Sequence, residues 1–427
     1  MHAQLNTFFS NHVELRRLWN SLSLILGRVS ASGLGFITTM LTARLYAPAE
    51  VGISSGIVSA MMLCVQIALL GVGSAVISVY PRHVNQSRKV INTGLNIIIL
   101  ASLLAALAFL GLSSVAFREL AIVSRSLVYT LMFFCTTLFG TVNVYLDHVS
   151  IVLRRGSQVL TRNVLFGIIT IVGVPLIPLI TGQQTSMSIL LAWVLAGLVA
   201  CVVGIFQLFR ALKGYSYRLE LDSSLVKELI WIGLPNYLLT LTERAPNWIM
   251  PIMVIELLSP SDTAIWYNVW MMAWVVFIIP ISVGQNLFAD VAHDPDALRA
   301  ALRRSNRTSI VLGTLAAIGT IAVAWVLLSV LGTTYADAGT LPLRILVLGV
   351  YPVIFVQSYY AICRGRHLLT EAIITGLASG IVSLTAAVTI GLNFGLAGMA
   401  TTWLITQFAA GGWALFRLRK LSGENKL

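Results

Sequence analysis

Long apolar segments alternate with short polar connections along almost the whole chain. A helix needs about 20 mostly apolar residues to cross a bilayer, and twelve segments meet this requirement. They lie at residues 18–46, 50–79, 90–115, 121–147, 158–180, 186–211, 226–257, 262–288, 308–331, 340–362, 368–390 and 394–416. The pattern therefore predicts an all-α polytopic membrane protein with about twelve transmembrane helices.

Basic residues lie mainly in alternate connections between these segments. The chain has 28 Lys and Arg against 16 Asp and Glu. If the N-terminus is cytoplasmic, most of the basic residues fall on the inner side, as Arg154, Arg162 and Arg364 do, and the outer connections carry almost none. Because Lys and Arg collect on the cytoplasmic side of membranes, we predict that both termini are cytoplasmic and that the protein lies in the cytoplasmic membrane.

Composition excludes several classes of protein. Of the 427 residues 57% are hydrophobic and 10% are charged, whereas an average soluble protein is about 25% charged. A soluble enzyme, a disordered chain and a nucleic-acid-binding domain are therefore excluded, and no nucleic-acid partner is expected. The sequence has no Walker A motif, metal-ligand cluster or nucleophile–base spacing, so we expect no metal, no cofactor and no enzymatic activity. The polar first 17 residues lack the apolar core of a signal peptide, and the first apolar segment is expected to remain as an anchor.

Short similarities recur at a spacing of about half the chain. Residues 44–50 align with residues 256–262 at an offset of 212, and residues 155–156 align with residues 364–365 at an offset of 209. Such self-similarity indicates an internal duplication. Transporters built from two repeats bind substrate between them near the bilayer midplane, so a central cavity is predicted. The predicted six-helix lobes are residues 1–215 and 216–427.

The seventh segment carries polar residues at membrane depth. Asn236, Thr240, Glu243 and Asn247 are four, three and four residues apart, which places them on one face of a helix, and Arg244 flanks this stripe. Ionisable residues at such depth are costly and are candidates for function. Three prolines in the same segment are expected to bend or break the helix.

Three other segments add candidates at membrane depth. Arg125 lies near a helix end and has the alternative of reaching the lipid headgroups. Asp147 lies one turn from the inner surface and has the alternative of pairing with Arg154. The additional candidates are Arg28 in the first segment, Gln66 in the second, and Arg125, Asn143 and Asp147 on one face of the fourth.

The predicted interior is cationic and rich in hydrogen-bonding groups, with few acids. The planar fork of arginine suits phosphate and pyrophosphate oxygens, and Asn, Gln and Thr suit hydroxyl groups. We therefore expect the cargo to be an anionic amphiphile with a phosphate, a hydroxyl-bearing head and an apolar tail. Five tryptophans are expected in packing and in the interfacial belt rather than as a sugar platform: Trp231, Trp248, Trp266, Trp270 and Trp274.

Three short stretches resemble a known family. Residues 42–52 read TARLYAPAEVG, residues 70–75 read LGVGSA and residues 233–235 read GLP. With the predicted topology, they resemble the multidrug/oligosaccharidyl-lipid/polysaccharide exporter superfamily in its polysaccharide-biosynthesis branch. Arg28 stands where lipid II flippases of that superfamily are expected to carry a cavity arginine.

The resemblance implies a flippase rather than an enzyme. Its substrate would be a polyprenyl-(pyro)phosphate-linked oligosaccharide, moved across the cytoplasmic membrane by alternating access without ATP for cell-surface polysaccharide biosynthesis. It also implies membrane lipid as a partner, together with the polysaccharide polymerase or glycosyltransferases of the same pathway.

Two alternatives stay open. One is a cation- or proton-coupled multidrug antiporter of the same fold that uses Glu243 as its ion site. The other is a membrane-embedded glycosyltransferase or ligase with Asp147 or Glu243 as base, although no connection is long enough for the outer loop such enzymes usually need. The flippase is the preferred prediction, with Glu243 and Asp147 as candidates for ion coupling. Its predicted substrate-binding residues are Arg28, Gln66, Arg125, Asn143, Asn236, Thr240, Glu243, Arg244 and Asn247.

Overall fold

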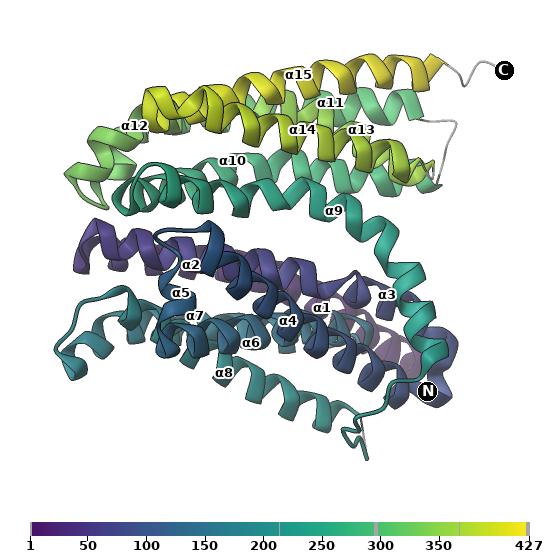
Figure 1. Ribbon diagram of the computed structural model, residues 1–427. Helices are drawn as coiled ribbons and strands as arrows, with labels where there is room; N and C mark the ends of the chain where they lie inside the picture. Colours follow the sequence, from purple (N-terminus) through teal and green to yellow (C-terminus); the bar gives the residue numbers. More distant parts are fainter. Residues whose placement is uncertain (1, 213, 294–297, 367, 424–427) are drawn as a thin grey trace. The chain divides into compact units, whose positions relative to one another are not determined.

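The computed structural model describes residues 2–212, 214–293, 298–366 and 368–423; the side chains of residues 1–21, 25, 28, 289–293 and 422–423 lie outside this description. The described chain is helical and contains no β-strand (Figure 1). The first part consists of α1 (His2–Leu45), α2 (Pro48–Leu69), α3 (Val72–Val79), the 3-10 helix η1 (Tyr80–Gln86), α4 (Ser87–Ala116), α5 (Ile122–Arg125), α6 (Leu127–Val152), α7 (Gly156–Thr181) and α8 (Ser186–Ala211). The second part consists of α9 (Ser223–Leu257), α10 (Pro260–His293), α11 (Leu298–Ser329), α12 (Thr333–Val347), α13 (Val350–Gly365), α14 (Leu369–Thr389), the 3-10 helix η2 (Gly391–Phe394) and α15 (Gly395–Gly423).

Each of the twelve predicted segments coincides with a helix or with a pair of consecutive helices. By length and composition, eight helices of the described chain could cross a membrane, or nine if the bent pair α12 and α13, at 44°, is one span. That number counts Pro48–Ala116 once, although it contains the second and third predicted segments, and it leaves out α9 and α15. The prediction of an all-α polytopic membrane protein is confirmed, whereas the orientation of the termini stays a prediction.

The fourth predicted segment is not one continuous helix. α5 ends at Arg125 and α6 begins at Leu127, because Ser126 between them has extended backbone angles (φ −111°, ψ 120°). The prediction that Arg125 shares a helix face with Asn143 and Asp147 is therefore wrong. Arg125 is exposed at the end of a single helical turn.

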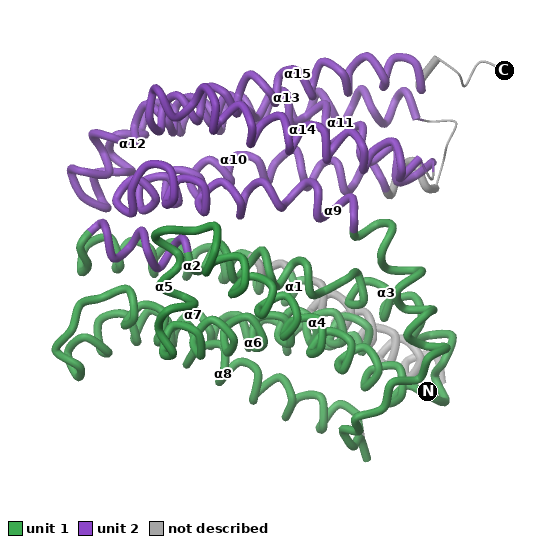
Figure 2. Tube along the Cα trace, viewed as in Figure 1, with its two compact units in different colours: residues 1–47, 57–237 green, residues 48–56, 238–427 purple. Residues whose placement is uncertain are grey.

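Contacts between residues divide the chain into two compact units (Figure 2). Unit 1 is residues 1–47 and 57–237, and unit 2 is residues 48–56 and 238–427. The division within α9 falls at Tyr237, and α9 is helical without interruption. The prolines, which were expected to bend or break this helix, therefore do not break it. The predicted repeat boundary at residue 215 stays a prediction.

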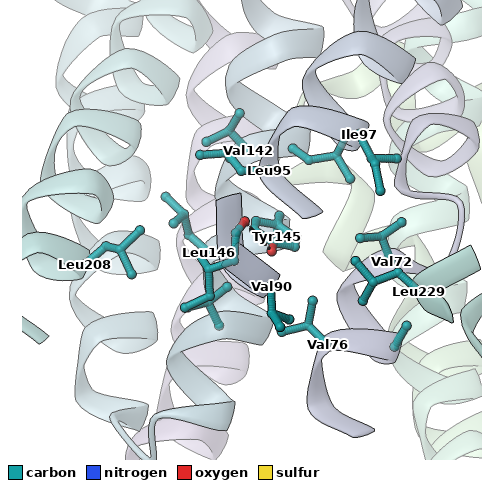
Figure 3. Close-up of a cluster of buried hydrophobic side chains, with 14 of the residues drawn as sticks. Val72, Val76, Val90, Leu95, Ile97, Val142, Tyr145, Leu146, Leu208 and Leu229 are labelled. Atoms are coloured by element: carbon teal, nitrogen blue, oxygen red, sulfur yellow. Dashed lines mark hydrogen bonds between the residues drawn. The ribbon is translucent and has the colours of Figure 1, made fainter. Parts of the chain in front are cut away.

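A cluster of buried side chains forms the core of unit 1 (Figure 3). It joins α3, α4, α6 and α8 to the start of α9 through Val76, Val90, Leu146, Leu208 and Leu229. Tyr145 lies in the middle of this cluster (Figure 3) and donates its hydroxyl hydrogen to the carbonyl of Ile91 at 2.9 Å, so that its polar group is satisfied inside the core.

An extended segment, residues 215–222, connects α8 to α9 along the first turns of α4. The amide nitrogens of Asn92 and Asn96 donate to three backbone carbonyls of this segment at 3.0–3.1 Å. The hydroxyls of Tyr215 and Tyr217 donate back to the amide oxygens of the same two asparagines. The side-chain amides of both asparagines are thus satisfied by this one segment, and these bonds fix where α9 begins.

The core of unit 2 joins α9, α10, α11, α13, α14 and α15 around Leu239, Leu287, Tyr359, Ile362 and Leu418. The first nine residues of α2, Pro48–Gly56, also belong to this unit. There Gly52 packs directly on the backbone carbonyl of Pro260, where a Cβ atom would overlap it. The turns before Gly52 and Pro260 are the two that align in the sequence repeat, and the close approach requires glycine.

Candidate functional site

A cavity of about 190 Å³ lies within unit 2. It is lined by five helices, namely α9, α10, α13, α14 and α15. Glycines of α14 allow α9 to come close: a Cβ on Gly376 would lie 2.5 Å from the hydroxyl oxygen of Thr242, and a Cβ on Gly380 would lie 3.2 Å from Pro246. The proline is thus packed in a helix–helix contact, and the two helices form one wall of the cavity.

Most of the polar stripe predicted on α9 faces this cavity. Thr240, Glu243 and Asn247 line it, and so does Arg244, which is exposed. Asn236, the first member of the predicted stripe, is not among the lining residues and belongs to unit 1. The helical spacing therefore identified one side of the cavity from the sequence.

An ion pair lies at one end of the cavity. Nη2 of Arg364 is 3.2 Å from Oε1 of Glu243, with 22% of the arginine and 15% of the glutamate side chain exposed. Sequence analysis missed Arg364, because it assigned this residue to a cytoplasmic connection. Arg364 is the penultimate residue of α13, and its side chain lines the cavity. The charged lining residues are thus two arginines and one carboxylate.

The rest of the lining combines neutral amides with aromatic rings. Gln285 of α10, Gln357 of α13 and Gln407 of α15 contribute carboxamides that sequence analysis did not select. A neutral amide in an apolar segment is less costly than a charge, and it gives a weaker signal in a sequence. The aromatic lining residues are Trp270, Trp274, Phe277, Tyr360 and Trp403.

Unit 1 contains the other predicted residues that the structure describes. Gln66 accepts hydrogen bonds from the hydroxyl of Tyr237 through its amide oxygen, at 3.1 Å, and through its backbone carbonyl. The amide nitrogen of Asn143 donates to the carbonyl of Gly197 at 3.1 Å, which packs α6 on α8. The side chain of Arg28 lies outside the described residues. These residues do not line the unit 2 cavity.

Asp147 has a different partner from the one considered in the sequence. Nη2 of Arg162 lies 2.6 Å from Oδ1 of Asp147, whereas Arg154 forms no ion pair within the described chain. Arg162 is 2% exposed, and it also donates to the amide oxygen of Gln207 at 2.5 Å and to the hydroxyl of Ser150 at 3.1 Å. Asp147 therefore belongs to a buried network. It lines a second, mostly apolar cavity in unit 1 together with Arg162 and Asn143.

No group of three or more His, Cys, Asp or Glu residues in the described chain could hold a metal ion. Among the described residues that line the unit 2 cavity, Glu243 is the one acid, and its partner is Arg364. The other polar lining groups are guanidinium, carboxamide, hydroxyl and indole groups.

A family model described as polysaccharide biosynthesis protein matches residues 18–285. This match covers more than half of the 427 residues. The chain belongs to the polysaccharide biosynthesis protein family. No curated protein matches it in sequence. The predicted membership of the multidrug/oligosaccharidyl-lipid/polysaccharide exporter superfamily is confirmed.

Solved structures similar to this family member are transporters. An inward-facing multidrug resistance MATE family transporter of the MOP superfamily has a TM-score of 0.74 at 14% identity, over 94% of this chain and 99% of that one. The lipid II flippase MurJ in an inward closed conformation has a TM-score of 0.71 at 12% identity, over 94% and 87%. A MOP superfamily transporter from Pyrococcus furiosus has a TM-score of 0.59 at 14% identity, over 95% and 96%. At such identities the likeness shows the fold, which is that of a multi-pass membrane transporter.

Proposed function

We propose that this polysaccharide biosynthesis family member is a flippase for a polyprenyl-(pyro)phosphate-linked oligosaccharide in the cytoplasmic membrane. The observation that carries the proposal is the unit 2 cavity, where Arg244 and Arg364 face a single carboxylate, Glu243. The surplus positive charge suits an anionic head group. A polymerase or glycosyltransferases of the same pathway would supply or consume the glycan.

Guanidinium groups are well matched to phosphate. Arginine presents a planar fork of donors that fits phosphate oxygens in pairs, and such charge-assisted bonds are stronger than neutral ones. Arg364 already forms an ion pair with Glu243. Arg244 is the more exposed of the two arginines and follows Glu243 directly in α9, so we assign it the main phosphate contact. Arg28 in α1 and Asn236 and Thr240 in α9 stay candidates for other steps of the cycle.

The antiporter alternative depends on Glu243 as an ion site. A carboxylate that binds a cation needs its charge available, whereas Arg364 neutralises Glu243 at 3.2 Å. The pair also leaves the cavity without surplus negative charge for a cationic drug. The geometry therefore supports an anionic substrate better than a cationic one, and Glu243 and Asp147 stay candidates for proton coupling.

Transport in proteoliposomes tests the proposal. The probe is the lipid-linked oligosaccharide extracted from membranes of cells that lack this chain, where a blocked flippase leaves it unpolymerised. Its appearance on the far leaflet is measured with a membrane-impermeant lectin or oxidant. We expect Arg244→Ala to lower the initial rate by about tenfold or more, because a hydrogen bond to a charged group is worth roughly 1.5–3 kcal/mol.

Two controls make the result specific. Arg303→Ala removes an exposed arginine on α11 that does not line the cavity, and it should leave the rate unchanged. Export of a cationic dye that disappears in Glu243→Gln would support the antiporter instead. Unchanged flipping in Arg244→Ala would remove the phosphate contact from the proposal, and no flipping by the wild-type chain would refute the function.

A further inference from the structure

Four carboxamide side chains line the unit 2 cavity without a hydrogen-bond partner among the described residues. They are Asn247, Gln285, Gln357 and Gln407. They come from four different helices, α9, α10, α13 and α15, and all four face the same space. A polar group at membrane depth without a partner is unfavourable, so their gathering in one cavity points to a polar ligand.

The chemistry of these groups narrows the class of ligand. A carboxamide both donates and accepts hydrogen bonds and carries no charge. A hydroxyl group has the same dual character, whereas a phosphate accepts only and an ammonium group donates only. Four neutral amides are therefore better suited to a polyhydroxylated ligand than to either kind of ion.

An indole ring stands on the wall of the same cavity. Trp274 is half-buried, and among the described residues its ring contact is with Phe277, at 6.4 Å between centroids and 85° between planes. In such a T-shaped pair one ring covers at most one face of the other, so at least one face of the indole is clear of aromatic rings. Trp270 differs, because Trp266 and Trp403 lie against it at 6.1 and 5.2 Å and leave it 9% exposed.

The charges and the aromatic wall lie toward opposite ends of α13. Arg364 is next to the last residue of that helix. The ring of Trp403 packs on Gly349, so closely that a Cβ there would overlap it, and Gly349 directly precedes the first residue of α13. The ring centroids of Phe277 and Trp403 are 5.6 Å apart. Gln357 lies seven residues before Arg364, a separation of about 10 Å along a helix axis. The cavity thus has the ion pair toward the last turn of α13 and the tryptophan-rich wall toward its first turn, with Gln357 between them.

We propose that Trp274 and the four carboxamides form a sugar subsite that adjoins the phosphate contact at Arg244. A sugar ring packs its apolar C–H face on the indole face that no aromatic ring covers and directs its hydroxyls to the amides. This inference rests on the proposed function and deepens it, because it names the part of the cavity that reads the glycan. It also revises the expectation that Trp274 serves packing or the interfacial belt.

An organic cation is the rival ligand, because aromatic rings also attract cations. The charged groups of the cavity argue against it, since two arginines stand against one carboxylate that is already paired. The rival becomes one arm of the test below, with tetraphenylphosphonium as the probe.

Binding to the full-length purified protein in detergent, followed by microscale thermophoresis, separates the subsites. The probes are the extracted lipid-linked oligosaccharide, undecaprenyl pyrophosphate without sugar, and tetraphenylphosphonium. The wild type should bind the oligosaccharide at least tenfold more tightly than the bare pyrophosphate. Trp274→Ala should lose about fivefold to tenfold of that affinity and leave the affinity for the bare pyrophosphate unchanged. Trp274→Phe should retain most of it, because a ring is kept.

Matched variants complete the design. Trp325→Ala removes a half-exposed tryptophan on α11 that does not line the cavity, and it should change nothing. Gln357→Leu should lower the affinity for the lipid-linked oligosaccharide alone, whereas Arg244→Ala should lower the affinity for both phosphate-bearing probes.

Three outcomes would overturn the sugar subsite. They are equal wild-type affinity for the two phosphate-bearing probes, equal losses for both probes in Trp274→Ala, and binding of tetraphenylphosphonium that depends on Trp274. None of them is the outcome that refutes the flippase, which is the absence of transport by the wild type.

Discussion

Both units contain a polar hub that ties three successive helices together, but the sign of its central charge is reversed. In unit 1 the centre is Arg162 of α7, which holds Asp147 of α6 and Gln207 of α8 at 2.6 and 2.5 Å. In unit 2 the centre is Glu371 of α14, which accepts two bonds of 2.6 Å from Arg417 of α15 and one of 2.9 Å from Tyr359 of α13.

The two central residues are equivalent in the sequence repeat. The offset of 209 that aligns residues 155–156 with residues 364–365 also aligns Arg162 with Glu371. The position and the three-helix connection are thus shared, whereas the charge is not. What this position requires is a charged group whose partners come from the neighbouring helices, since a buried network is favourable only when its members are satisfied. Unit 2 also contains the ion pair of Glu243 and Arg364, which lies outside its hub and lines the unit 2 cavity.

The largest effect on stability is expected from the hub of unit 1. Arg162→Ala removes a side chain that is 2% exposed, together with its 2.6 Å ion pair to Asp147, which is 28% exposed. Breaking a buried ion pair from one side costs about 3–5 kcal/mol, and we expect the lower part of that range because Asp147 is partly exposed. Thermal unfolding of the detergent-solubilised protein measures the loss.

Two variants give the comparison for this prediction. Arg118→Ala, at a side chain that is 91% exposed, should leave the melting temperature unchanged. Replacing both charges, with Asp147→Asn and Arg162→Met, should recover part of the loss because the carboxylate that Arg162 pairs with is then neutral as well. A melting temperature of Arg162→Ala equal to that of the wild type would show that the hub does not stabilise unit 1.

A smaller effect is expected from the hub of unit 2. The side chains of Arg417 and Glu371 are 18% and 30% exposed, so water replaces part of what a substitution removes. Glu371→Gln keeps one acceptor for Arg417 and should cost about 1–2 kcal/mol, measured by the same thermal unfolding.

Exchanging the hubs sharpens the comparison. Glu371→Arg with Arg417→Gln gives unit 2 the arginine and glutamine of unit 1, but Tyr359 supplies no carboxylate. This double variant should be less stable than Glu371→Gln, and adding Tyr359→Asp should restore part of the stability. If the triple variant is no better than the double variant, the two hubs are not interchangeable.

These hubs also show which features the sequence can predict. The helices follow from apolar length, because backbone polar groups in a bilayer must be satisfied within the segment. The stripe of Thr240, Glu243 and Asn247 follows from helical spacing, and all three line one cavity. Sequence analysis missed the break at Ser126, although Ser124, Arg125 and Ser126 interrupt the apolar run there and serine is common directly before a helix.

Long-range partners are harder to predict than faces. Counting basic residues by connection assigned Arg162 and Arg364 to the cytoplasmic surface, yet one is enclosed and the other pairs with Glu243. A long arginine side chain at a helix end can point to water or back into the bundle, and neighbouring helices decide which. The repeat offset was the available signal, because it matches Arg162 with the acid Glu371 rather than with another surface cation.

The smallest effect is expected at a carboxylate outside both hubs and outside the membrane-spanning segments. Asp222 precedes α9 and accepts hydrogen bonds from the hydroxyl of Ser224 and from the backbone N–H groups of Leu225 and Ser224. These bonds, with a further one from Lys89, lower the pKa of Asp222 from 3.8 to about 2. Because the folded-state pKa is depressed, the stabilisation is complete above about pH 4 and is lost as pH falls toward 2.

Asp222→Asn should therefore lower the melting temperature slightly at neutral pH, by removing the charge from the start of α9. The difference from the wild type should shrink between pH 4 and pH 2, where the wild-type carboxylate is protonated. Ser224→Ala is the matched variant, because it removes the hydroxyl that contributes most to the depressed pKa of Asp222. In the Ser224→Ala background, Asp222→Asn should lower the melting temperature by less than it does in the wild type. If the difference in melting temperature between the wild type and Asp222→Asn stays constant across this pH range, Asp222 stabilises α9 through hydrogen bonding and not through its charge. The start of α9 would then differ from the two hubs, whose stability is expected to depend on charge.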